Sequence, residues 1–84
     1  MPGQPLELLT FAERLDALMR EQEIGLERLG RETGISPRLI SKYRKGRTVP
    51  RDAFGEPSRN ALKLARALGV SLADLLPPDE EQAA

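Results

Sequence analysis

The chain has 84 residues, among them 13 basic and 13 acidic side chains, with no cysteine and no histidine. So short a chain buries one modest core, which predicts a single domain and leaves no room for a large enclosed active site. The missing residue types exclude disulfides, thiolate and imidazole metal sites, and catalysis by either side chain, so we expect no enzyme, no metal and no cofactor.

The apolar residues are mostly leucine and alanine, whereas the β-branched and aromatic residues that strands prefer are few. This composition predicts an all-α fold. Apolar runs such as Leu8–Leu9 and Leu75–Leu76 are far too short for a membrane span or a signal peptide. We therefore expect a cytoplasmic protein with no membrane-bound part.

The first predicted helix follows a short leader. Two prolines and a glycine in the first five residues indicate a flexible leader over residues 1–9, and the folded domain is expected over residues 10–77. Thr10 followed by Glu13 is a capping box, which marks a helix start. The helix should end near Glu23, since apolar residues recur on one face at Phe11, Leu15, Leu18 and Met19.

Two shorter helices come next. Gly25 separates the first helix from a stretch over residues 26–33, which Gly34 stops because glycine adopts the left-handed conformation of a helix end without penalty. Ser36 followed by Pro37 is a strong start signal. The third helix is therefore expected over residues 37–45, closed by Gly46.

The last part of the chain predicts a connection and two more helices. Residues 47–56 lack helical periodicity and form a connection that is long for so small a domain. Pro57 and Ser58 open a fourth helix that ends at Gly69, with these residues facing inward: Ala61, Leu62, Ala65 and Leu68.

A second capping box, Ser71 with Asp74, starts a short fifth helix that Pro77 ends. Its apolar residues are Leu72, Leu75 and Leu76. Residues 78–84 are expected to form a flexible acidic tail.

The third predicted helix carries different residues on its two sides when it is wound at about 100° per residue. Leu39, Ile40 and Tyr43 share one side, where we expect core packing rather than base contact. The opposite side holds Arg38, Ser41, Lys42 and Lys45. Such groups bind guanine edges and phosphates in a major groove, and a solvated helix face is the alternative.

The charges are unevenly placed along the chain. Residues 28–51 hold eight basic and one acidic side chain, whereas residues 1–27 hold two and six, and residues 52–84 hold three and six. A basic middle of this kind steers a surface toward a polyanion, while the acidic flanks discourage indiscriminate binding.

Residues 26–45 resemble the helix-turn-helix of the phage-repressor type, the XRE or Cro/repressor family. The matching positions are Leu29, Gly30, Gly34, Ile35, Ile40 and Tyr43. A small residue lets the two helices cross closely, and glycine permits the tight turn between them. Residues 62–71 and 75–76 resemble the last two helices of the family, so the resemblance covers about residues 10–77.

Three features depart from the family pattern. Leu26 stands where a glutamine is common at the start of the second helix, so a customary polar contact is missing. Thr33 stands where an apolar residue is usual, which leaves a hydroxyl to bond back to the helix backbone. The connection after Gly46 is longer than usual.

The resemblance implies a compact five-helix lambda-repressor-like domain that presents its second and third helices to double-stranded DNA. Base contacts carried over by position fall on Ser36, Pro37, Arg38, Ser41 and Lys42. Arg38 and Lys42 are the favoured base readers, because their long donors reach guanine edges. Phosphate contacts are expected from Arg28, Arg31, Arg44, Lys45, Arg47 and Arg51.

We therefore expect a sequence-specific transcriptional regulator, a repressor that acts by occupying an operator. One such module covers only a few base pairs, so a homodimer on half-sites about one helical turn apart is expected, with the fifth helix and the acidic tail as candidate dimer surfaces. The alternative is an antitoxin or adaptor that binds a protein partner, with DNA binding secondary. Leu26 and the acidic flanks leave that alternative open.

Overall fold

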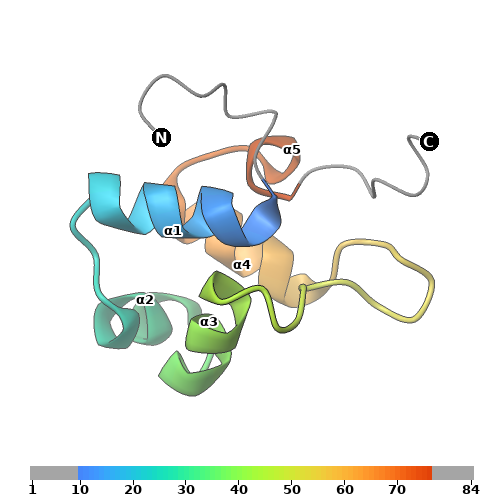
Figure 1. The fold of residues 1–84 in the computed structure, drawn as a ribbon, viewed down its shortest axis with the longest axis horizontal. Helices are drawn as coiled ribbons and strands as arrows, with labels where there is room; N and C mark the ends of the chain where they lie inside the picture. The colour runs from blue at the N-terminus through green and yellow to red at the C-terminus, as the bar shows by residue number, and fades with distance from the viewer. Residues whose placement is uncertain (1–9, 77–84) are drawn as a thin grey trace.

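The computed structural model describes residues 10–76, which form five helices joined by short turns and one longer loop (Figure 1). The helices are α1 (Phe11–Glu21), α2 (Leu26–Thr33), α3 (Pro37–Arg44), α4 (Arg59–Leu68) and α5 (Leu72–Leu75). The predicted all-α, five-helix fold is confirmed. The predicted leader, acidic tail and helix stop at Pro77 lie outside the described residues. Within residues 10–76, no helix is long and apolar enough to cross a membrane.

A single apolar core holds the helices together. Helix α1 packs against α3 and α5, while α4 packs against α2 and α5 (Figure 1). Each helix contributes a large aliphatic side chain with no exposed surface: Leu15, Leu29, Ile40, Leu64 and Leu75. Since the core draws on every helix, no helix could be removed without opening it to water.

The predicted helix starts are confirmed at their caps. At the start of α1, the Thr10 hydroxyl accepts from the Glu13 amide (3.3 Å) and the Glu13 carboxylate accepts from the Thr10 amide (2.9 Å), which completes the capping box. Ser36 accepts from the Leu39 amide and Ser71 from the Asp74 amide, each at 3.1 Å. These bonds satisfy backbone donors that the first turn of a helix leaves without partners.

Helix α1 and its C-cap residue also hold α5 and the end of α4 through two long side chains. Arg14 is buried and donates from Nη1 to the backbone oxygens of Ala73 (3.2 Å) and Asp74 (2.8 Å). Gln22 donates from Nε2 to the Leu68 oxygen at the end of α4 (2.7 Å). These side chains satisfy carbonyls that short helices leave free at their C-terminal ends.

Two details of the sequence-based prediction are wrong. Helix α1 ends at Glu21, two residues before the expected Glu23, where a positive φ of 54° turns the chain. Leu62 does not face inward, since it is 49% exposed while Leu64 is fully buried. With α4 starting at Arg59, the inward side falls on Ala61, Leu64, Ala65 and Leu68. Leu62 lies about 100° away from that side.

The turn between α2 and α3 is built around Gly30, Thr33 and Gly34. Gly34 ends α2 with a φ of 78°. A side chain at Gly30 would place its Cβ 2.9 Å from the Ile35 oxygen and 3.2 Å from the Pro37 ring, so the two helices meet where only glycine fits. The Thr33 hydroxyl donates to the Leu29 oxygen (2.7 Å), which is the predicted bond back to the helix backbone, and it also accepts from the Ile35 amide (3.1 Å).

Gly30→Ala should therefore destabilise the protein. We expect the free energy of unfolding to fall by roughly 1 kcal/mol, because overpacking costs about 1 to 3 kcal/mol and the better helix propensity of alanine returns at most about 1. Chemical denaturation followed by circular dichroism measures the change. Arg31→Ala, at the next and exposed position of α2, is the control and should stay within about 0.5 kcal/mol of the parent. An unchanged Gly30→Ala midpoint would show that the turn yields easily.

Candidate nucleic-acid interface

The inner side of α3 fixes the helix on the core. Ile40 and Tyr43 are buried, which confirms their expected packing role. The Tyr43 ring meets the Phe11 ring of α1 edge to face, with centroids 5.7 Å apart. The Tyr43 hydroxyl accepts from Asn60 Nδ2 on α4 at 3.1 Å. Because α3 is held on both flanks, its outer side has one orientation.

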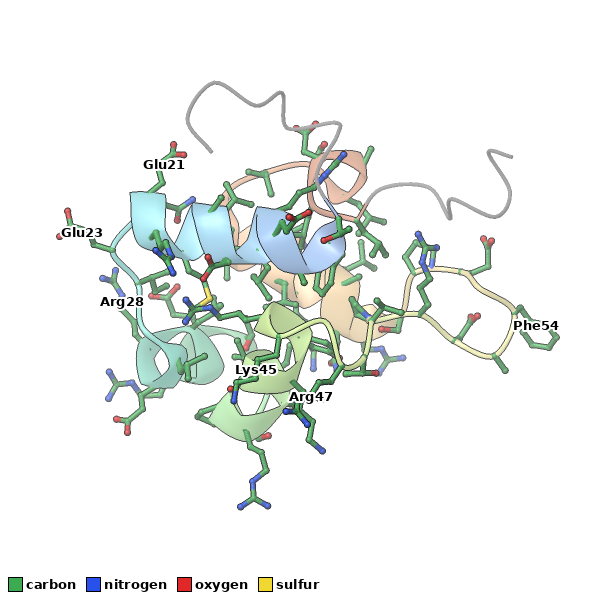
Figure 2. The ribbon with its side chains drawn as sticks, viewed as in Figure 1. Glu21, Glu23, Arg28, Lys45, Arg47 and Phe54 are labelled. Atoms are coloured by element: carbon green, nitrogen blue, oxygen red, sulfur yellow. The ribbon has the colours of Figure 1, made fainter. Side chains whose placement is uncertain are left out.

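The outer side of α3 is cationic. The side chains of Arg38, Lys42 and Lys45 are exposed, and Ser41 lies between them, partly buried. These residues border an open groove along the helix, lined by Leu26, Pro37, Arg38, Ser41, Lys42, Lys45 and Arg47. Figure 2 shows Lys45 and Arg47 side by side near the C-terminal end of α3. The structure thus brings four of the predicted base contacts and two of the predicted phosphate contacts onto one surface.

Leu26 lies in the same groove. It is the first residue of α2 and is partly buried against the core. Together with Pro37 it adds an apolar surface beside the cations. In the sequence Leu26 indicates only a missing polar contact, whereas in the structure it forms an apolar side of the groove.

A second shallow groove lies at the turn between α2 and α3. Arg31 and Ser36 share it with Pro37, which also lines the first groove. Ser36 is exposed, although its hydroxyl is engaged in capping α3. Arg28 is also exposed and pairs with Glu32 one turn along α2 (3.1 Å). Of the two predicted contacts on α2, Arg31 therefore borders the N-terminal end of α3, whereas Arg28 lines neither groove.

Besides Arg28, two of the predicted phosphate contacts bind groups of the chain itself. Arg44 turns away from the groove and donates to Asp16 on α1 through Nε (3.1 Å) and Nη2. Arg51 donates from Nη1 to the Gly55 oxygen (2.6 Å) in the loop that precedes α4. Arg44 lies about 40° from Ile40 around the helix, so its angular position alone was a signal that it faces the body of the protein.

Asp16 pairs with two arginines, Arg44 on α3 and Arg20 on its own helix α1. Its other carboxylate oxygen accepts from Arg20 Nε at 2.9 Å. The hydrogen bond from Arg44, with a further contribution from Arg20, lowers the pKa of Asp16 below its ordinary value of 3.8. Asp16 was not singled out in the sequence, because a contact with Arg44 across two helices leaves no local pattern.

Comparison with known proteins places these features among DNA-binding domains. Residues 14–81 match the family described as Cro/C1-type HTH DNA-binding domain. The fold is similar to that of the P22 c2 repressor protein, whose crystal structure is a complex with synthetic operator 9T in the presence of Tl⁺. The TM-score is 0.68 and the sequence identity 30%, over 84% of this chain and 98% of that chain. No match was found among curated proteins.

The ion pair of Asp16 predicts a pH-dependent stability. Because the pKa of Asp16 is lowered in the folded state, its stabilising effect is complete above the unfolded pKa near 4 and is lost as pH falls through the folded pKa. Asp16→Asn should therefore lower the melting temperature at neutral pH, and the difference should shrink below about pH 4. Melting curves followed by circular dichroism across this range measure it.

The control for this experiment is Glu21→Gln on the same helix. Glu21 is exposed and points away from the body of the protein (Figure 2). We expect it to leave the melting temperature nearly unchanged at every pH. A difference between parent and Asp16→Asn that stays constant from neutral to acid pH would contradict the assigned ion pair.

Proposed function

The chain belongs to the family of Cro/C1-type HTH DNA-binding domains, and we propose that it is a sequence-specific repressor that acts by occupying an operator. The observation that carries the proposal is the outer side of α3, where three exposed cations border an open groove. A helix with such a side fits the major groove of B-form DNA. The similar P22 c2 repressor was crystallised with operator DNA, which supports the same use of this surface.

We assign base recognition to the first two turns of α3. Arg38 is exposed there, and its planar guanidinium suits two hydrogen bonds to one guanine. Lys42 lies one turn further along beside Ser41, and Ser36 adds a hydroxyl at the N-cap. The apolar surface of Leu26 and Pro37 is suited to a thymine methyl group.

We assign phosphate contacts to the borders of this surface. Lys45 and Arg47 lie beyond the C-terminal end of α3, while Arg28 and Arg31 lie on α2. All four are exposed. Arg44 would have to leave Asp16 to reach a phosphate, and Arg51 would have to leave Gly55. We therefore assign these last two arginines first to holding α3 and the loop in place.

A single copy of this surface covers too few base pairs for useful specificity. We propose a homodimer that places two copies of α3 on half-sites about one helical turn apart, so that the operator repeats the two-fold symmetry of the protein. Binding and release of the operator, without any covalent step, would then be the regulatory event.

A salt titration tests DNA binding against the alternative of a protein-binding module. Fluorescence anisotropy with a labelled mixed-sequence duplex should show binding at low salt. The logarithm of the affinity should then fall linearly with the logarithm of salt concentration, because bound cations release the counterions of DNA. A variant with Arg38, Lys42 and Lys45 changed to glutamine should keep its helix content and lose this binding. Absence of salt-dependent binding in the parent chain would favour the protein-binding module.

The division of roles along α3 predicts two different losses. Arg38→Ala should weaken binding to the preferred site by about 1 to 3 kcal/mol and relax the preference at one base pair. Arg47→Ala should weaken all duplexes alike and lower the salt slope by about one unit. The measurement is anisotropy on short duplexes selected from random sequences.

Arg20→Ala is the control for both variants, because it removes one exposed positive charge from α1. It should leave affinity and specificity close to those of the parent. If Arg38→Ala and Arg47→Ala lose equal affinity on selected and random duplexes, the division of roles is wrong.

A further inference from the structure

The loop between α3 and α4 exposes a phenylalanine to solvent. Phe54 is 89% exposed, which is more than any other large apolar side chain within residues 10–76. It projects from the tip of the loop, away from Lys45 and Arg47 (Figure 2). Transfer of an aromatic ring out of water lowers the free energy. An exposed ring on an ordered support therefore indicates a contact surface.

This segment, the Phe54 loop (residues 51–57), is internally hydrogen-bonded. Arg51 and Pro57 form an isolated antiparallel bridge at its base, and the Asp52 amide donates to the Glu56 oxygen (2.9 Å). The Asp52 carboxylate accepts from the amides of Phe54 (2.8 Å) and Glu56 (3.0 Å). The loop therefore presents Phe54 on a defined support, so ordering it for a contact costs little.

The Phe54 loop is also anchored at the start of α4. The Ser58 amide donates to the oxygen of the buried Pro50 at 2.8 Å, which closes the loop directly before the helix begins at Arg59. The base of the Phe54 loop therefore adjoins the start of α4.

The outer side of α4 is basic, whereas the tip of the Phe54 loop is acidic. The exposed residues of α4 are one leucine and, to one side of it around the helix, three cations, and we call this the Leu62 face: Arg59, Leu62, Lys63 and Arg66. These four fall within about 100° around the helix. Within residues 10–76 none of the three cations forms an ion pair. The tip of the Phe54 loop, residues 52–56, carries two carboxylates and no basic residue.

We propose that the Phe54 loop of one copy of this chain docks on the Leu62 face of a second copy. Phe54 would cover Leu62, while Asp52 and Glu56 would meet the cations beside it. In a two-fold dimer the same contact forms twice, so each chain supplies both halves. A second copy is favoured over an unrelated partner because one chain carries both the acidic apolar surface and its basic apolar complement.

This interface deepens the proposed function, because it identifies how the homodimer forms. Its role in operator binding rests on the proposed function, whereas the contact itself is argued from the surfaces of the chain. The interface is an alternative to the dimer surface expected at the fifth helix and the acidic tail. The outer side of α3 stays free for DNA, because Phe54 points away from it (Figure 2).

Sedimentation of the full chain without DNA tests the interface. The parent should pass from monomer to dimer as concentration rises, and Phe54→Ser should raise the dissociation constant about tenfold or more, since two copies of the ring contact are lost. Val49→Ser is the control. It also replaces an exposed apolar side chain (Val49 is 47% exposed) by serine, but Val49 lies outside the proposed contact. A parent that stays monomeric, or a dimer that Phe54→Ser leaves intact, would overturn the proposal.

Charge exchange gives a more specific test. Glu56→Lys and Lys63→Glu should each weaken the dimer, and the double variant should recover much of it, because the opposite charges then meet again across the interface. Recovery distinguishes a direct contact from a general effect of net charge. Two losses that simply add in the double variant would argue against the pairing.

Cross-linking locates the contact. The chain has no cysteine, so a mixture of the single variants Phe54→Cys and Leu62→Cys should form a mixed disulfide dimer under mild oxidation. Glu21→Cys replaces Leu62→Cys in the control mixture, which should yield far less. Equal yields from the two mixtures would place the second copy elsewhere.

Anisotropy with a single half-site duplex separates this proposal from the proposed function. Phe54→Ser should bind that duplex as the parent does, with the same salt slope. If the variant instead loses half-site affinity while its dimer is unchanged, the loop contacts DNA and the dimer proposal is wrong. If the parent dimerises through Phe54 but binds no duplex, the interface stands and the DNA-binding function fails.

Discussion

The burial of one side of α3 determines the direction of everything on its other side. Ile40 and Tyr43 occupy the core, and Tyr43 contacts both Phe11 and Asn60. A helix of eight residues has little stability alone, so its orientation comes from this packing. The positions of Arg38, Lys42 and Lys45 follow from it, because residues on one helix keep fixed angles to one another. The chemistry of the surface is thus set from inside the protein.

The local features of the fold could be predicted because their causes are local. A hydroxyl before a helix, a glycine after it and a proline at its first position act on neighbouring backbone groups, so Thr10, Gly34 and Ser36 were readable from the sequence. The side of α4 that faces the core could not be predicted in this way, because Leu62 and Leu64 both fit an apolar helical pattern. Packing against α2 and α5 decides between them.

The candidate site was predictable in outline and less so in the roles of individual arginines. Helical spacing separates the outer cations of α3 from Ile40 and Tyr43, and that separation is observed. It does not show that Arg44 meets a carboxylate on another helix or that Arg51 holds a loop. Four arginines close together in the sequence therefore differ in their surroundings: Arg44 binds Asp16 and Arg51 binds the Gly55 oxygen, while Arg38 and Arg47 are exposed. The contact of Arg44 depends on a partner that is distant in sequence, and that of Arg51 on a backbone turn.

The close approach of Pro37 to Gly30 has a thermodynamic consequence for association. The proline ring and the Ser36 cap fix the first turn of α3 in the free protein, against a helix that offers no side chain at that point. The backbone at this end of the helix is already ordered before a ligand binds. The entropic cost of ordering it on association is therefore small. The heat capacity change of association should accordingly be that of contact between preformed surfaces, without the large contribution of coupled folding.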